Sequence, residues 1–352
     1  MTPAPLFRVG VMQLTMEPLE EILEHARVMD EAGFDTIWLA EAYPWWRKHS
    51  MEARSSTALS PLVARETERL AVGWGIISPY TRHPVQIAME ARVTQEAAGP
   101  GRFYLGLGVS KIFMRHAGIG EGSKPVAAMT EAAEIVRSVL RGDELDFAGK
   151  VFEAHVPALR EEADTPRWDV PLYFAGTGPM MLRAAARAGD GLLTASITTP
   201  AFVRYVREQV AAAGRDPDTL DLGCTIVASV DEDAERGRDG AREIAAMYLA
   251  NKVQNIQAAA DTLLECAGLT RDEIVPIAEA MERGGRLAAK AEVTDAILDK
   301  CKPIAGTPAD CVAAIEEYRA AGCTHIMLEI WGDDRTGQAK LFGEAVLPHF
   351  AR

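Results

Sequence analysis

Short apolar runs alternate with longer amphipathic segments along the whole chain, and this alternation constrains the fold more than any other feature. The runs are rich in β-branched and aromatic residues. Between them, apolar residues recur every three or four positions, as on one face of a helix. Strands are expected at 8–12, 34–41, 70–76, 102–107, 171–175, 191–195, 220–230 and 324–330. Repeated strand–helix units predict the α/β class, with a parallel sheet covered by helices.

Eight units that continue to the end of the 352 residues favour a (β/α)8 TIM barrel over an open doubly wound sheet. A Rossmann sheet would carry a G-x-G-x-x-G turn after its first strand, where this chain has QLTMEP at 13–18. Two stretches, 108–170 and 231–300, exceed a normal connection, so we expect insertions after the fourth and seventh barrel strands. The first should contain a hairpin at 144–156. We expect residues 1–352 to form one barrel domain.

Charge and composition narrow the partners and the compartment. The formal net charge of −14 opposes binding to nucleic acid or to anionic lipid. No apolar run is long enough to span a membrane, and the N-terminus does not resemble a secretory signal. The five cysteines are widely spaced and odd in number, and the seven histidines form no ligand cluster. We therefore expect a cytoplasmic protein without a metal site that acts on a small molecule.

Glycine-rich turns follow three of the expected strands, at the barrel end where active sites lie. The turn GTGP at 176–179 opens a helix, whose free N–H groups and dipole would suit a phosphate. An ordinary turn is the alternative. Gly106 and Gly108 would let the backbone approach a bound group. Gly73 and Gly75 indicate either such an approach or a bend at the barrel rim.

Polar and aromatic side chains follow the second and third strands. The segment EAYPWW at 41–46 places Glu41 at the rim of an aromatic wall. Tryptophans there suit a flat heteroaromatic ligand, although a loop packed on its own aromatics is the alternative. We expect a pocket lined by Trp45, Trp46, Trp74 and Trp331. His83 lies close to this end as well, either as a catalytic group or as a helix cap.

Neither a G-x-S-x-G nucleophile turn nor a P-loop occurs in the sequence, which favours a pocket whose cofactor carries the reaction. The segments SPYTRHP at 78–84, GRFYLGLG at 101–108 and GTGPMML at 176–182 resemble the luciferase-like monooxygenase superfamily. Its members are (β/α)8 barrels that bind FMN or the deazaflavin coenzyme F420. The likeness covers nearly the whole chain and is greatest to the branch with F420-dependent methylenetetrahydromethanopterin reductases and sugar-phosphate dehydrogenases.

The resemblance implies roles for particular residues. The Gly75–Ile76 bond matches a non-prolyl cis peptide that lies behind the cofactor ring. The positions implied near the ring and its side chain are Gly106, Gly108 and Ser110, and Ser78 is a further expected cofactor-binding residue. The phosphate would lie at Gly176, Thr177 and Gly178. The family comparison also implies a homodimer.

Two departures from the family pattern bear on proton transfer. An Asp-His pair of the family matches Glu41-Ala42 here, and Met12 stands where the methanopterin reductases carry an acidic residue. The proton must then be handled by Glu41, Tyr43, His83 or water. Glu41 is the expected acid or base, because burial among tryptophans would raise the pKa of a carboxyl group.

Three hypotheses follow for the activity. The leading one is an oxidoreductase that transfers a hydride between coenzyme F420 and a small organic substrate. The second is an FMN-dependent monooxygenase on the same barrel. The third is a barrel that uses no flavin and binds a nicotinamide cofactor or another ligand directly. Side-by-side binding titrations with the three cofactors separate these hypotheses.

Overall fold

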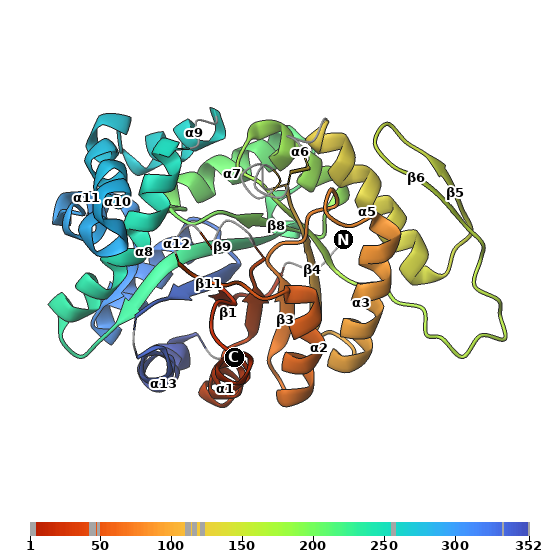
Figure 1. Ribbon diagram of the computed structural model, residues 1–352, viewed down its shortest axis with the longest axis horizontal. Helices are drawn as coiled ribbons and strands as arrows, with labels where there is room; N and C mark the ends of the chain where they lie inside the picture. The colour runs from red at the N-terminus through yellow and green to blue at the C-terminus, as the bar shows by residue number, and fades with distance from the viewer. Residues whose placement is uncertain are drawn as a thin grey trace.

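Eight parallel strands close into a barrel in a computed structural model of the chain (Figure 1). The structure describes residues 5–41, 47, 50–109, 114, 118–119, 124–254, 258–332 and 334–350. The sheet closes because β9 pairs with both β8 and β11. The barrel strands are β1 (Arg8–Gln13), β2 (Thr36–Leu39), β3 (Ala71–Trp74), β4 (Phe103–Leu107), β7 (Leu172–Ala175), β8 (Gly191–Thr194), β9 (Asp221–Val230) and β11 (His325–Ile330). The predicted TIM barrel is confirmed.

One strand was not expected from the sequence. The strand β10 (Ile304–Gly306) pairs in parallel with the far end of β9, outside the closed ring. Three residues are too few for a periodic pattern to stand out. The predicted barrel strands all occur, and the differences from the observed bounds lie at their ends, where a hydrogen-bonding pattern cannot be read from the sequence.

Helices cover the outside of the barrel, and proline begins many of them. Its fixed φ suits the first turn, where its missing N–H costs no helical hydrogen bond. Proline stands in the first turn of α3, α5, α6, α7 and α12. The covering helices are α1 (Leu19–Ala32), α2 (Ser56–Glu66), α3 (Pro84–Ala98), α5 (Pro125–Arg141), α6 (Pro179–Ala188), α7 (Pro200–Ala212), α12 (Pro308–Ala320) and α13 (Arg335–Ala345).

The two insertions lie at opposite ends of the long axis of the molecule (Figure 1). The first carries the predicted hairpin, as β5 (Leu145–Ala148) and β6 (Glu153–Val156). The Glu131 carboxylate fastens its turn by accepting hydrogen bonds from the amides of residues 150–152. The second insertion is helical and contains α8 (Ala234–Gln254), α9 (Ala258–Ala267), α10 (Arg271–Ala291) and α11 (Asp295–Cys301). Among the described residues, no helix is both long and apolar enough to cross a membrane.

Large side chains fill the inside of the barrel near the start of the strands. Trp38 stacks on Tyr104 at a centroid distance of 5.8 Å and meets Tyr173 edge-on. Glycines on the same inner face make room for these rings. A Cβ on Gly73 would lie 2.4 Å from the Trp38 ring, and one on Gly191 would lie 2.1 Å from the Tyr173 ring. Gly73 is therefore explained by packing, and neither a bend nor a bound ligand is needed there.

Candidate active site at the barrel mouth

The bend after β3 has the unusual backbone that the resemblance implied. The peptide bond between Gly75 and Ile76 is cis. Directly after it, Ile77 forms an isolated parallel bridge with Leu107 at the end of β4. Ser78 is buried, and its hydroxyl accepts a hydrogen bond from the Tyr80 amide within the following turn. The cis bond is thus confirmed, and its backbone lies at the C-terminal end of the barrel, called the mouth below.

Gly106 and Gly108 bring three strand ends close together. A Cβ on Gly106 would lie 2.0 Å from the Trp74 carbonyl oxygen, so this glycine lets β4 approach β3. A Cβ on Gly108 would lie 2.7 Å from the Ile76 side chain and 3.1 Å from Ala175 of β7. The residues at 76, 108 and 175 therefore meet at the mouth. Contact of these glycines with a bound molecule stays a prediction, and Ser110 lies outside the described residues.

The turn after β7 presents the beginning of a helix to the mouth. Gly178 is the N-cap of α6, and Pro179 occupies the first turn. The Gly176 amide donates to Leu193 of β8. Within the described part of the chain, the amides of Thr177, Gly178 and Met180 donate to no protein acceptor. No acidic residue stands in the first turn of α6. These amides and the helix dipole provide a positive site that suits an anion.

Glu41 follows β2, but its described contacts are polar rather than aromatic. Its carboxylate pairs with Arg82 at 2.5 Å. The other oxygen accepts hydrogen bonds from the amide and the hydroxyl of Ser56, both at 3.0 Å, in the first turn of α2. Glu41 therefore joins the start of α2 to the loop before α3. The acid–base role of Glu41 stays a prediction, and Tyr43 lies outside the described residues.

His83 is the N-cap of α3, as the structural alternative predicted. Its Nδ1 accepts a hydrogen bond from the Val85 amide, so its Nε2 carries the hydrogen and donates to the Glu153 carbonyl oxygen at 3.2 Å. The ring also meets Phe152 edge-on. The exposed imidazole thus connects α3 to the β5–β6 hairpin. These contacts give no support to a catalytic role for His83.

The tryptophans expected to form the pocket wall lie in different places. Trp74 is fully buried on the outer face of β3, where its indole N–H donates to the Ser60 hydroxyl at 2.9 Å. Successive side chains of a strand point to opposite faces of the sheet. Because Gly73 faces the inside of the barrel, Trp74 points outward to the covering helices and does not line the mouth. Trp331 directly follows β11, and its ring lies 4.7 Å from the Arg335 guanidinium. Trp45 and Trp46 lie outside the described residues.

The sequence analysis missed a buried carboxyl group near the mouth. Glu329 is 0% exposed and lies near the end of β11, beside Val227 of β9. Its oxygens accept hydrogen bonds from Tyr248 Oη at 2.5 Å and from Ser196 Oγ at 2.8 Å. Burial raises the pKa of Glu329 to about 7. The available signal was an acidic residue inside an otherwise apolar strand, IMLEI at 326–330.

A lysine also lies close to Tyr248. Lys252 is one helical turn beyond Tyr248 on α8, and burial lowers its pKa to about 8. Glu329 lies 81 residues from Tyr248 along the chain, so their proximity could not be recognised in the sequence. Glu329 and Lys252 give the mouth two groups that can change protonation near neutral pH.

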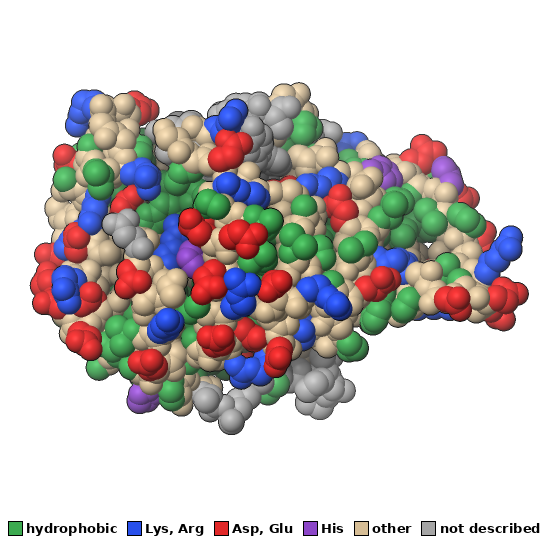
Figure 2. All heavy atoms as spheres, turned by 60° about the horizontal axis from the view of Figure 1, so that its bottom comes forward, with side chains coloured by type: hydrophobic (Ala, Val, Ile, Leu, Met, Phe, Trp, Pro, Cys, Tyr) green, Lys and Arg blue, Asp and Glu red, His purple; other side chains and the backbone are tan. Residues whose placement is uncertain are grey.

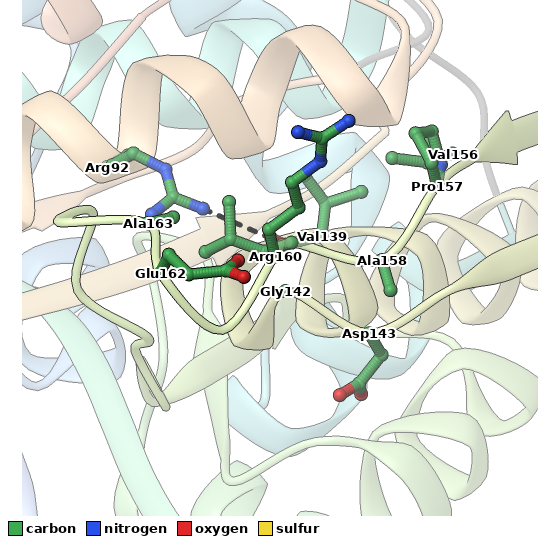
Figure 3. A pocket seen from close by; sticks show the side chains of 11 residues that line it. Arg92, Val139, Gly142, Asp143, Val156, Pro157, Ala158, Arg160, Glu162 and Ala163 are labelled. Atoms are coloured by element: carbon green, nitrogen blue, oxygen red, sulfur yellow. Dashed lines mark hydrogen bonds between the residues drawn. The ribbon is translucent and has the colours of Figure 1, made fainter.

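A separate hollow lies away from the mouth, beside the hairpin arm. It has a volume of about 660 Å³ and is open to solvent (Figure 3). Arg92 of α3 reaches across it and donates to the Val139 carbonyl oxygen at 3.2 Å. Its other walls are the C-terminal end of α5 and the segment 156–163 after β6. None of the predicted site residues lines it.

The charges visible on the surface are mixed in sign. Figure 2 shows acidic and basic side chains interspersed over the face that it presents. Among the described residues, there is no group of three or more His, Cys, Asp or Glu side chains placed to hold a metal ion.

Comparisons with known proteins agree with this fold. The chain is 28% identical over 338 residues to a 5,10-methylenetetrahydromethanopterin reductase of Archaeoglobus fulgidus, covering 93% of this chain and 95% of the relative. It is 26% identical to an F420-dependent glucose-6-phosphate dehydrogenase of Amycolatopsis mediterranei, with 93% of each covered.

A solved structure has the same architecture. The coenzyme F420-dependent tetrahydromethanopterin reductase from Methanopyrus kandleri superposes with a TM-score of 0.84 at 24% identity, over 98% of this chain and 100% of that one. The luciferase-like monooxygenase family matches residues 4–325. With most of its length matched, the chain belongs to the luciferase-like monooxygenase family.

Proposed function

We propose that this protein is an oxidoreductase that transfers a hydride between coenzyme F420 and a small organic substrate. Two kinds of relative, the reductases and the sugar-phosphate dehydrogenases, align over more than nine-tenths of the chain. The names of these relatives describe different substrates, and those of the dehydrogenases specify F420 as the cofactor. We accordingly assign the cofactor and the reaction class to this chain and leave its substrate to experiment.

The residues at the mouth fit a planar cofactor with an anionic tail. The cis bond at Gly75 and Ile76 gives a fixed bend at the end of β3, against which a ring can lie. The unpaired amides at Thr177 and Gly178 suit the anionic tail, because a helix N-terminus favours negative charge. When bound, the deazaflavin supplies or accepts the hydride. Ser78, Gly106, Gly108 and Ser110 are proposed to complete this cofactor site.

The protein's own part in the reaction is to position the reactants and to exchange a proton. Trp331 is buried beside Arg335 and Arg286, at 4.7 and 5.7 Å from its ring, so its plane is held from moving. Arg335 in turn pairs with Glu17, which follows β1. This ordered wall would orient a substrate beside the cofactor and exclude water from the reacting atoms. Trp45 and Trp46 remain proposed members of the same wall.

Cofactor titrations of the full-length protein test this function. We expect saturable binding of F420, with weaker or no binding of FMN, NADH and NADPH. Gly178→Asp should weaken F420 binding by placing a negative charge at the start of α6, whereas Gly214→Asp, on an exposed turn, is the control for added charge. Tight binding of FMN with oxygen consumption would instead support the monooxygenase hypothesis. A preference for a nicotinamide cofactor would support the third hypothesis.

We also propose a cytoplasmic homodimer built from one barrel domain per chain. Leu62 of α2 and Met89 and Val93 of α3 are 44%, 59% and 56% exposed, and α2 packs against α3. Such side chains on neighbouring helices suit an isologous contact. The five cysteines are unpaired, which fits a reducing compartment. Light scattering of the native protein and of Met89→Glu tests the dimer, since the charged variant should become a monomer.

A further inference from the structure

The reaction proposed above needs a group at the mouth that can give up or take a proton. Hydride transfer to a carbonyl carbon adds two electrons and leaves an alkoxide oxygen, which takes up one proton, and oxidation of an alcohol releases one. Glu41 already accepts hydrogen bonds from Arg82 and from the first turn of α2. Glu329 is a second carboxyl group near the mouth, and its surroundings suit a group that holds a proton.

The partners of Glu329 are neutral hydroxyl groups. Tyr248 and Ser196 contact separate oxygens of the carboxyl group, and no cation pairs with it among the described residues. This differs from Asp221 inside the opposite end of the barrel, which pairs with Arg8. A buried carboxyl group without a cation favours its protonated form.

Within the described part of the chain, the side chains next to Glu329 on the barrel's inner face are apolar. Val227 lies beside it on β9, and Met327 precedes it on the inner face of β11. Met12, on the inner face of β1, is also apolar. The charged groups on the elements around it include Lys252, one turn beyond Tyr248 on α8, and Arg335 and Arg286 beside Trp331. Arg335 is paired with Glu17, and Arg286 is paired with Glu243.

Tyr248 connects the buried carboxyl group to the mouth. Glu329 is fully buried, whereas Tyr248 is only partly buried. The hydrogen bond between Tyr248 Oη and a Glu329 carboxyl oxygen is 2.5 Å long. Either oxygen can be its donor, because the position of the hydrogen follows the protonation state. When the carboxyl group is protonated, it can donate to the phenol oxygen, which leaves the phenol O–H free to donate toward the mouth.

We propose that Glu329 stores the proton that accompanies hydride transfer and that Tyr248 passes this proton between the carboxyl group and the substrate. The inference rests on the proposed function and deepens it. In this scheme Tyr248 touches the substrate, and Glu329 acts through Tyr248. Ser196 holds the second carboxyl oxygen in place.

The step balances when it is written for a carbonyl substrate. With bound F420 as the hydride donor, the carbonyl carbon would gain a C–H bond and two electrons, and the C=O π bond would break. The substrate oxygen takes the phenol proton of Tyr248, and the phenol oxygen takes the carboxyl proton of Glu329. The products are an alcohol, oxidised F420 and a Glu329 carboxylate, which regains a proton from solvent. Oxidation of an alcohol follows the same steps in reverse.

The first test uses the free protein and requires no substrate. Infrared difference spectra should show the C=O stretch of a protonated carboxyl group that disappears with a midpoint near pH 7, in keeping with the pKa of about 7. Glu329→Gln should lack this band. Tyr248→Phe should move the midpoint upward, because the Tyr248 hydrogen bond lowers the pKa of Glu329. Tyr205→Phe, on α7 away from the mouth, should leave the midpoint unchanged.

The second test measures turnover with F420 and a panel of alcohols, aldehydes and ketones. Glu329→Gln and Tyr248→Phe should each lower kcat by about a hundredfold while F420 affinity stays within about twofold. The wild-type pH profile should show an inflection near neutral pH that Glu329→Gln removes. Lys252→Met should retain that inflection, which separates the carboxyl group from the lysine.

The outcomes distinguish this inference from the proposed function. Absence of F420 binding would refute the function, and the infrared titration would still decide whether Glu329 holds a proton near neutral pH. Absence of the protonated-carboxyl band from the wild type would overturn the inference. An unchanged pH profile in Glu329→Gln would overturn it as well, even if F420 binds tightly.

Discussion

The two ends of the barrel hold buried carboxyl groups in opposite ways. At the start of the strands, Asp221 accepts hydrogen bonds from Arg8, the Tyr173 hydroxyl and the Thr324 hydroxyl. At the mouth, the partners of Glu329 among the described residues are the Tyr248 and Ser196 hydroxyls. A cation compensates the first carboxylate, so it is held charged as part of the structure. The second lacks that compensation and is suited to gain and lose a proton.

Titratable neighbours show the same contrast. Burial and the charge of Arg8 hold the pKa of His325 well below its usual value, so its imidazole stays neutral beside Asp221. Its Nε2 accepts from the Trp38 indole N–H at 3.4 Å and lies 2.7 Å from the Thr36 hydroxyl. Burial instead raises the pKa of Glu329 to about 7. At the start of the strands, His325 therefore keeps one protonation state at neutral pH, whereas Glu329 at the mouth can switch between two.

The largest expected effect comes from removing the charge of Asp221, which lies at the start of the strands. Asp221→Asn leaves the partly buried Arg8 beside a neutral amide and should lower the free energy of unfolding by about 3 kcal/mol. Urea denaturation measures this change. Asp146→Asn, on the exposed hairpin, is the matched control and should change stability by less than about 1 kcal/mol. Equal effects of the two variants would show that the Arg8–Asp221 pair does not stabilise the barrel.

The next effect depends on pH and has a defined sign. An unfolded glutamate ionises near pH 4.5, whereas native Glu329 ionises near pH 7. Between these values the unfolded state releases a proton that the native state retains. Stability therefore decreases as pH rises through this range, by on the order of 3 kcal/mol. Glu329→Gln should remove this component.

Urea midpoints at about pH 5 and about pH 8 measure the effect in both proteins. Other titrating groups contribute equally to the wild type and the variant, so the difference between their pH dependences isolates Glu329. Identical pH dependence in the two proteins would contradict a raised pKa for this carboxyl group.

A pair of glycine variants compares how tightly the two ends are packed. A Cβ at Gly191 would lie 2.1 Å from the rigid Tyr173 ring, whereas one at Gly176 would meet the flexible Met181 side chain at 2.4 Å. Gly191→Ala should therefore destabilise by about 1–3 kcal/mol, and Gly176→Ala by less. Thermal denaturation of both variants gives the comparison. A larger loss at Gly176 would mean that the mouth is the more rigid end.

The smallest expected change concerns Glu41. This residue lies near the mouth but is paired with an arginine, as Asp221 is. Glu41→Gln weakens the contact with Arg82 and the cap of α2, and should lower stability by about 1 kcal/mol. Denaturation measures this loss. Turnover of the same variant tests the acid–base hypothesis, for which a decrease of about a hundredfold with F420 binding intact is required.

Local patterns predicted much of the fold. Strand–helix alternation predicted the number and order of the barrel strands. The hairpin at 144–156 also formed, since its alternation is local. The strand β10 was missed because its three residues carry no readable period. Trp74 was assigned to the wrong side of its strand, because the inner and outer faces of a buried strand are both apolar.

The candidate site was less accessible to sequence reasoning. Glycine turns and the cis bond follow individual strands, so the resemblance located them. Glu329 shows its character only with Tyr248, 81 residues away, and Ser196, 133 residues away. Neither separation repeats as a motif.

The sequence by itself determined the α/β alternation, the closed barrel, the family resemblance and the strand ends at which chemistry would occur, because these follow from local periodicity and from short motifs. Only the tertiary structure decided which buried carboxyl group has a cation beside it and which has not. Closing the barrel brings distant residues into contact and removes water, and the free energy of a charged group depends on both. That is why Asp221 belongs to the framework and Glu329 to the proposed chemistry, although each is one acidic residue in an apolar strand.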